Sequence, residues 1–137
     1  MRQVLSIEQM KHLKELGLDT SDASMYWARV SHGSRVDDKS KGKWFLSLHK
    51  EFQTCGFMSY ESIPTYTLQD IINKLPCFIG DEVLTIQKLA DSYTCLYIEP
   101  YTRSMINITE SKEPIDAAYD MLCWCIENGY VKVGKEE

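Results

Sequence analysis

The sequence predicts an α+β protein with one antiparallel sheet of about five strands and three helices, in the order α-β-β-α-β-β-β-α. Strand-like runs follow one another in clusters, and capping residues and glycines bound the helical runs. The regular alternation of strand and helix that marks a parallel α/β sheet is missing. At 137 residues the chain is expected to form a single domain over residues 1–137.

The first helix is predicted to begin after Ser6. Ser6 can cap the helix and Gln9 can complete a capping box, while Leu5 and Met10 occupy the positions of a hydrophobic staple. Gly17 is expected to end this helix, because glycine readily adopts the left-handed conformation found just after a helix.

Two strands are expected next, in ASMYWARV (residues 23–30) and in KWFLSLH (residues 43–49). Both runs are rich in aromatic and aliphatic side chains, as strands are. In the second run Trp44 alternates with Leu46 and Leu48, and this spacing predicts that the three side chains share the core face.

A long polar segment separates these two strands. It reads SHGSRVDDKSKG over residues 31–42, and its length, its glycines and its few apolar side chains predict a mobile loop. The stretch FQTCGFMSYESIPT, residues 52–65, is expected to contain one short strand ahead of Pro64.

The second helix, LQDIINKL, is predicted to begin after Thr67, which is a good N-cap, with Asp70 in its first turn. Tyr66 is placed to form a hydrophobic staple with Ile71. Pro76 is expected to end this helix, because proline has no backbone N–H to donate.

Three strand-like runs, EVLTIQKL, YTCLYIE and RSMINIT, come after the second helix. Short polar turns separate them, which is the spacing of an antiparallel meander. A long helix is then predicted from about Pro114 to Asn128. Proline favours the first turn of a helix, and Gly129 stands where a left-handed residue would end it.

The last helix contains the segment LCWCIENGY, residues 122–130, in which Cys123 and Cys125 flank a tryptophan. Residues two apart on an α-helix point about 200° away from each other, so these two thiols cannot hold one zinc ion or form a disulfide together. The five cysteines of the chain also lack the spacing of a disulfide framework. We expect all five to be reduced thiols, with no metal or other cofactor bound.

The last helix is also apolar on two sides, which predicts burial on both. The first apolar stripe has the spacing of a core-facing helix: Ile115, Ala118, Tyr119, Leu122, Cys125 and Ile126. The second stripe consists of Ala117, Met121 and Trp124. It lies either under another part of the chain or against another molecule. In the second case these residues form an interface for a protein partner or for self-association, since tryptophan often anchors such contacts.

The net charge of −5 is distributed unevenly. Residues 29–50 contain six basic and two acidic side chains, which gives this segment a charge of +4. The side chains placed for a polyanion contact are Arg35, Lys39, Lys41 and Lys43. Basic groups beside aromatic residues are typical of single-strand binding. A nucleic-acid-binding accessory protein that uses this basic loop is therefore the alternative function.

Known catalytic motifs are missing from the sequence. It has no nucleophile elbow, zinc-protease motif, phosphate-binding loop, EF-hand or dinucleotide fingerprint. His12, His32 and His49 are far apart, so only the fold could bring them together. No apolar run is long enough for a signal peptide or a membrane span. We therefore expect a non-enzymatic, cytoplasmic protein without membrane contact.

Three blocks of the chain, MKHLKELGLDTSDASMYW, YTLQDIINKLP and IDAAYDMLCWCIENGYVK, resemble small uncharacterised proteins encoded in prophages and other mobile elements of gut bacteria. The blocks span most of the chain but leave out the basic loop, and they consist of core and cap positions. By analogy, the resemblance implies a small accessory protein that acts by binding, and it implies no catalytic residue. The predicted function is therefore that of an interaction or accessory protein of phage or mobile-element origin.

Overall fold

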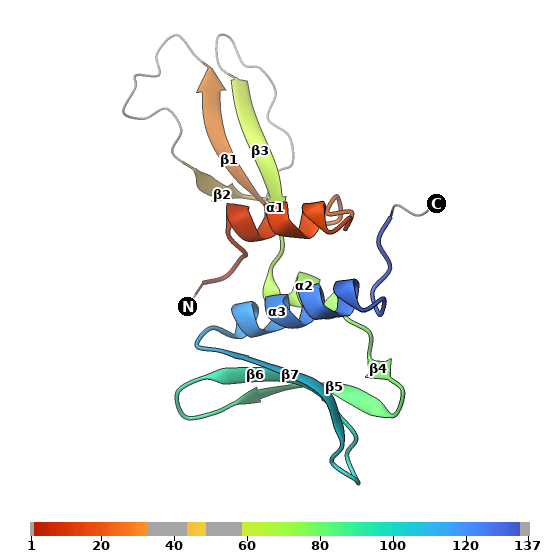
Figure 1. Ribbon diagram of the computed structural model, residues 1–137. Coiled ribbons are helices and arrows are strands. Elements are labelled where there is room, and N and C mark those ends of the chain that lie inside the picture. Colours follow the sequence, from red (N-terminus) through yellow and green to blue (C-terminus); the bar gives the residue numbers. More distant parts are fainter. Residues whose placement is uncertain (1, 33–43, 49–58, 135–137) are drawn as a thin grey trace.

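The computed structural model describes residues 2–32, 44–48 and 59–134. Over these residues three helices and seven strands form the layers shown in Figure 1. In chain order they are α1 (Ile7–Glu15), β1 (Met25–His32), β2 (Phe45–Ser47), β3 (Ser59–Thr65), α2 (Leu68–Lys74), β4 (Phe78–Ile79), β5 (Glu82–Lys88), β6 (Tyr93–Ile98), β7 (Met105–Ser111) and α3 (Pro114–Glu127).

Helix α1 begins as the sequence predicts and is fixed to α3. Ser6 Oγ accepts the Gln9 N–H at 3.1 Å, and the Gln9 side chain accepts the Ser6 N–H at 2.9 Å, which completes the capping box. Gln9 Nε2 donates to Asp116 of α3 at 2.9 Å. Met10 and Leu13 are buried in the core that the helices share. Polar and apolar contacts therefore hold α1 over α3.

The first sheet is antiparallel, with strand order β2-β1-β3. Its β1–β3 register runs from Met25 opposite Thr65 to His32 opposite Ser59. Strand β3 continues through Pro64, so the strand does not stop before this proline as predicted. A proline is tolerated here because β3 is an edge strand of the sheet.

Strand β1 extends through residue 32, so the first two residues of the loop predicted over 31–42 belong to a strand. Residues 33–42 lie outside the described residues.

Strand β2 corrects the predicted core face of the second run. Leu46 is 39% exposed and Leu48 is 70% exposed, whereas Trp44 is half-buried. The physical reason is position: β2 is a three-residue edge strand, and the core cluster contains no residue from it.

Helix α2 begins at the predicted cap and is tied to the first sheet through Asp70. Thr67 Oγ1 accepts the Asp70 N–H at 3.1 Å, and the Asp70 carboxylate accepts the Thr67 N–H at 3.0 Å. The same carboxylate accepts the N–H of Ser24 at 3.1 Å and its hydroxyl at 2.6 Å. Asp70 therefore joins the start of α2 to the segment that leads into β1.

The second sheet is an antiparallel meander, with strand order β4-β5-β6-β7, and it includes the three strands predicted in this region. Strand β4, only two residues long, was not predicted. Helix α3 packs on β6 and β7, and Thr109 Oγ1 of β7 donates to the Ala117 carbonyl of α3 at 2.7 Å. In Figure 1, α2 and α3 lie between α1 and this sheet.

The main core lies between α1, α2, α3 and the inner side of the second sheet. Its largest fully buried side chains are Tyr66, Tyr97, Leu5, Leu13, Ile71, Ile115, Met121 and Leu122. The buried tyrosines keep their hydroxyl groups paired: Tyr97 donates to the Pro76 carbonyl at 2.7 Å, and Tyr66 donates to Asp22 at 3.1 Å.

The structure confirms the predicted α+β class. It differs from the prediction in the sheets: the described residues form seven strands in two sheets, where the sequence predicted about five strands in one. Helix α2 separates the first sheet from the meander along the chain.

Candidate functional site

The second sheet has one side turned toward α3 and one side turned away from the helices. In its central strand β6, Cys95 and Tyr97 are fully buried and lie next to Cys125 of α3. Because successive side chains of a strand point to opposite sides, Leu96 and Ile98 point away from α3. In Figure 1 no described helix covers this second side.

The strand register extends this side across the whole sheet. Leu96 is paired with Thr85 and Ile108, and Ile98 is paired with Val83 and Met105. Phe78 of β4 is in turn paired with Val83. Directly paired residues share a side of the sheet. We call the resulting apolar surface the outer face; it consists of Phe78, Val83, Leu96, Ile98, Met105 and Ile108.

Much of the outer face is open to solvent. Phe78 is 63% exposed, Met105 51% and Ile108 48%, whereas Leu96 at the centre is only 4% exposed because its neighbours surround it. These three exposed side chains leave on the order of 300 Å² of apolar surface in water. Contiguous apolar patches of this size on a monomer are often functional.

Apart from Thr85, which is paired with Leu96, the polar groups on this side of the sheet lie at one end. Gln87, Thr94 and Glu110 are paired there, and the Thr94 hydroxyl donates to Gln87 Oε1 at 3.4 Å. Glu110 accepts the Ser92 hydroxyl at 2.6 Å. None of the six outer-face residues is charged, so this surface suits an apolar partner better than a polyanion.

The interface predicted on α3 is corrected for two of its three residues. Ala117 and Met121 are fully buried, because this stripe packs on β7: the Ala117 carbonyl accepts the Thr109 hydroxyl, and Met121 Sδ accepts Asn107 Nδ2 at 3.7 Å. Neither residue can therefore reach another molecule.

Trp124, the third residue of the predicted interface, is half-buried. Its ring stacks on that of Tyr130, with the ring centroids 5.4 Å apart. This contact gives Trp124 a partner within the chain.

The cysteines of α3 occupy separate surroundings, as the helical spacing predicts. Cys125 is fully buried beside Tyr97, and Cys123 is half-buried beside Tyr119. Burial raises the pKa of each thiol to about 11, and it raises the pKa of Cys95 to about 12. At neutral pH these three groups are protonated and weakly nucleophilic.

The predicted polyanion contacts Arg35, Lys39, Lys41 and Lys43 lie outside the described residues. Next to them in the chain, Trp44 packs under the Arg29 guanidinium, whose central carbon is 4.5 Å from the ring centroid.

Arg29 also pairs with Glu61 at 3.0 Å. Lys11, Trp27, Arg29 and Trp44 contribute to the lining of a shallow hollow of about 530 Å³ beside α1. Basic and aromatic side chains therefore do meet on this side of the first sheet.

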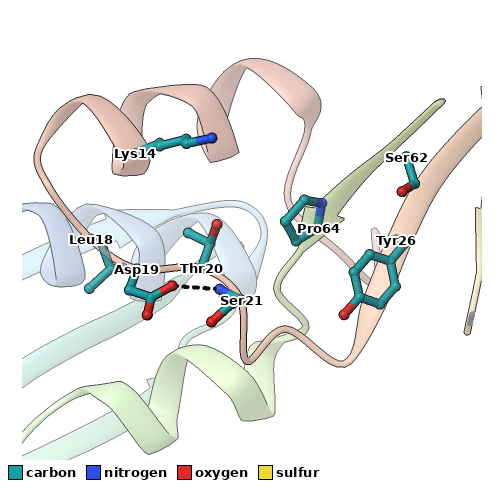
Figure 2. Close-up of a pocket in the computed structure, with 8 residues that line it drawn as sticks. All are labelled: Lys14, Leu18, Asp19, Thr20, Ser21, Tyr26, Ser62 and Pro64. Carbon is teal, nitrogen blue, oxygen red and sulfur yellow. Dashed lines mark hydrogen bonds between the residues drawn. The ribbon is translucent and has the colours of Figure 1, made fainter. Parts of the chain in front are cut away.

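A separate groove lies between α1 and the first sheet. Figure 2 shows Lys14 reaching over it from α1, with Pro64 and Tyr26 on the sheet side and Asp19 on the opposite side. The carboxylate of Asp19 accepts the Ser21 N–H at 3.0 Å. Hydrogen bonds from Ser21 lower the pKa of Asp19, so it is ionised at neutral pH.

Sequence reasoning missed the outer face. It identified the three long strands of the meander, but it did not assign Leu96, Met105 or Ile108 to an exposed side. The available signal was the run of apolar residues at every position from Cys95 to Ile98 in β6. In β7, Met105 and Ile108 share the outer side only because the register shifts opposite Tyr97 and Ile98, and simple alternation would have placed them on opposite sides. A central strand with apolar side chains on both sides shows that the two sides of its sheet are both apolar.

Comparisons with family models, curated proteins and solved structures found no match for this chain. Among the described residues, no three histidine, cysteine or acidic side chains are gathered in a way that could hold a metal ion. Within the same part of the chain, no helix has the length and apolar character needed to cross a membrane.

Proposed function

We propose that this chain is a non-enzymatic accessory protein that binds another protein through the outer face. The observation that supports this function is the apolar side of the second sheet, with Phe78, Met105 and Ile108 about half or more exposed. The phage or mobile-element setting is part of the proposal and rests on the resemblance of the three sequence blocks.

The size of the outer face indicates what kind of binding it can support. Covering on the order of 300 Å² of apolar side chain contributes about 7 kcal/mol at 25 cal/mol per Å². Association itself costs roughly 4–15 kcal/mol in lost freedom of motion. The apolar centre alone therefore gives weak binding, and a stable complex must also use the polar groups around it.

The partner class follows from the same surface. An uncharged apolar sheet surface fits the apolar stripe of a helix or another sheet, with Glu110 and the other polar groups at one end making contacts at the rim. A second copy of this chain meets that description, and so does an unrelated protein. Light scattering separates self-association from binding to an unrelated protein.

The test is Ile108→Asp, which places a charge on the outer face at a position that is 48% exposed. The matched control is Tyr101→Ser, since Tyr101 is 91% exposed and lies in the β6–β7 turn, outside the outer face. Both variants should keep the circular dichroism spectrum of the wild type. The wild type and the two variants are then compared in three measurements. These are the binding of an apolar fluorescent dye, self-association at high concentration, and capture of a partner from host lysate.

The proposal requires that Ile108→Asp reduce dye binding and abolish either self-association or capture of a partner. Tyr101→Ser should leave all three measurements unchanged. Equal dye binding and equal capture by the wild type and Ile108→Asp would refute it.

A second candidate function is single-strand nucleic-acid binding, supported by Arg29 over Trp44 and by Lys11 in the neighbouring hollow. Aromatic rings beside cationic groups offer bases a stacking surface. Fluorescence anisotropy with a labelled single-stranded oligonucleotide at low salt tests this function. Binding should weaken about tenfold in Trp44→Ala, the loss of roughly 1–3 kcal/mol expected for one stacked base. Unchanged binding in that variant would exclude Trp44 as the contact.

A further inference from the structure

The groove between α1 and the first sheet is large enough for a small molecule. It consists of two adjoining hollows of about 280 and 200 Å³, which share Lys14, Thr20, Ser62 and Pro64. Together they reach the size range of small-molecule sites, which starts at roughly 300 Å³. Figure 2 shows that Lys14 of α1 and Tyr26 of β1 reach the groove from different elements.

Two positive charges belong to the α1 wall of this groove. Lys11 and Lys14 are one turn apart, so both lie on the same side of the helix, and both line the smaller hollow. Ion pairs engage Arg2, Arg29 and Lys74, but neither Lys11 nor Lys14 pairs with a carboxylate in the described chain.

Two hydroxyl groups in the groove are also available. Tyr26 and Thr20 are each 8% exposed, and neither hydroxyl has a hydrogen-bond partner among the described residues. In that part of the chain every fully buried polar side-chain atom has a hydrogen-bond partner. Because these two hydroxyls have none, they are not fully buried and must reach solvent. Both side chains line the larger hollow, and that is where their hydroxyls can meet a ligand.

The remaining wall is partly apolar. Met10, Leu18, Ile63 and Pro64 line one or both of the hollows. These side chains can contact the carbon body of a ligand. A bare inorganic ion would leave this apolar wall unused. Asp19, on the larger hollow only, disfavours negative charge at its end of the groove.

We propose that this groove binds a small organic anion. Its anionic group lies at the Lys11 and Lys14 end, and its carbon body lies against Leu18 and Pro64. The hydroxyl of Tyr26 hydrogen-bonds to a second polar group where the ligand has one; butyrate has none and tests the anionic and apolar contacts. This site is separate from the outer face and does not depend on the protein-binding function.

Titration of the full-length protein with three probes, followed by two-dimensional NMR, tests the site. Butyrate supplies a carboxylate on a short carbon chain, butyramide is its neutral counterpart of the same shape, and inorganic phosphate supplies charge alone. We expect butyrate to cause saturable shifts at Thr20, Ser21 and Tyr26, and we expect butyramide and phosphate to cause much weaker ones.

Substitution then assigns the charge. Lys14→Met keeps the length of the side chain and should weaken butyrate binding about three- to fivefold, the effect of losing one partly exposed ion pair. Lys88→Met, at an exposed position of β5, is the matched control and should leave binding unchanged.

Three results would overturn the proposal: no saturable shift with butyrate, equal binding of butyrate and butyramide, or equal binding by the wild type and Lys14→Met. Binding of phosphate without binding of butyrate would also overturn it, because the apolar wall would then have no role.

Discussion

Asp70 joins two parts of the fold, so its removal should destabilise the protein well beyond the usual effect of a surface substitution. Its carboxylate accepts the Thr67 N–H that opens α2, and it accepts both the N–H and the hydroxyl of Ser24 ahead of β1. Asp70→Ala removes one half of the capping box, a loss of about 1 kcal/mol. It also removes the two hydrogen bonds with Ser24. Each of them contributes about 1 kcal/mol or less to stability, because Ser24 is exposed.

The expected loss for Asp70→Ala is therefore about 2–3 kcal/mol in the free energy of unfolding at pH 7. Urea denaturation followed by circular dichroism measures it. The matched control is Asp81→Ala, since Asp81 is exposed and makes no hydrogen bond or ion pair within the described chain. The control should change the free energy of unfolding by less than about 0.5 kcal/mol.

The effect of Asp70 should also depend on pH in one direction. Burial alone would raise the pKa of this carboxyl, but hydrogen bonds from Ser24 and Thr67 outweigh burial and lower the pKa below its ordinary value. A carboxyl with a lowered folded-state pKa stabilises the protein fully above its unfolded-state pKa of about 3.9, and this stabilisation is lost as the pH falls through the folded-state pKa.

The difference in stability between the wild type and Asp70→Ala should therefore be largest near pH 7 and should shrink below about pH 4. A difference that stays constant from pH 7 to pH 3, or one no larger than that of Asp81→Ala, would refute the assigned role.

Two further predictions concern thiols and an aromatic pair. In the native protein, iodoacetamide should modify the exposed Cys77 much faster than the buried Cys95 and Cys125, whose pKa values are about 12 and 11. Peptide mass spectrometry after timed quenching measures the rates. Equal rates at all three sites would contradict the assigned burial. Trp124→Ala should lower the free energy of unfolding by roughly 1–3 kcal/mol, because it removes the stack on Tyr130 and part of the core edge. Light scattering should give the same mass for this variant as for the wild type, and a loss of self-association would instead restore Trp124 as an interface residue.

The helices were predicted well because their ends depend on local chemistry. Ser6 with Gln9 and Thr67 with Asp70 form capping boxes within four residues of sequence, and the structure contains both. Gly129 ends α3 with a positive φ of 80°, as expected for a glycine after a helix. Such signals need no knowledge of the rest of the chain.

The strands were harder to predict because their surroundings are set by tertiary contacts. The alternation of Trp44 with Leu46 and Leu48 is a valid strand pattern, but it does not show which side of the strand is covered. Pro64 suggested the end of a strand, yet an edge strand can accept a proline. The sequence shows that a segment is extended and leaves open whether it lies at the edge or at the centre.

The same limit explains why the candidate interface moved from α3 to the sheet. Helix α3 has two apolar sides, and the structure covers both: Met121 contacts β7, and the ring of Tyr119 meets that of His12 in α1 at 6.4 Å. Once α3 is enclosed, it no longer offers a free apolar stripe. The sheet beneath it has helices on only one side, although its central strand is apolar on both. The second sheet therefore keeps an uncovered apolar surface on the outer face, around Met105 and Ile108, and a partner gains by covering it.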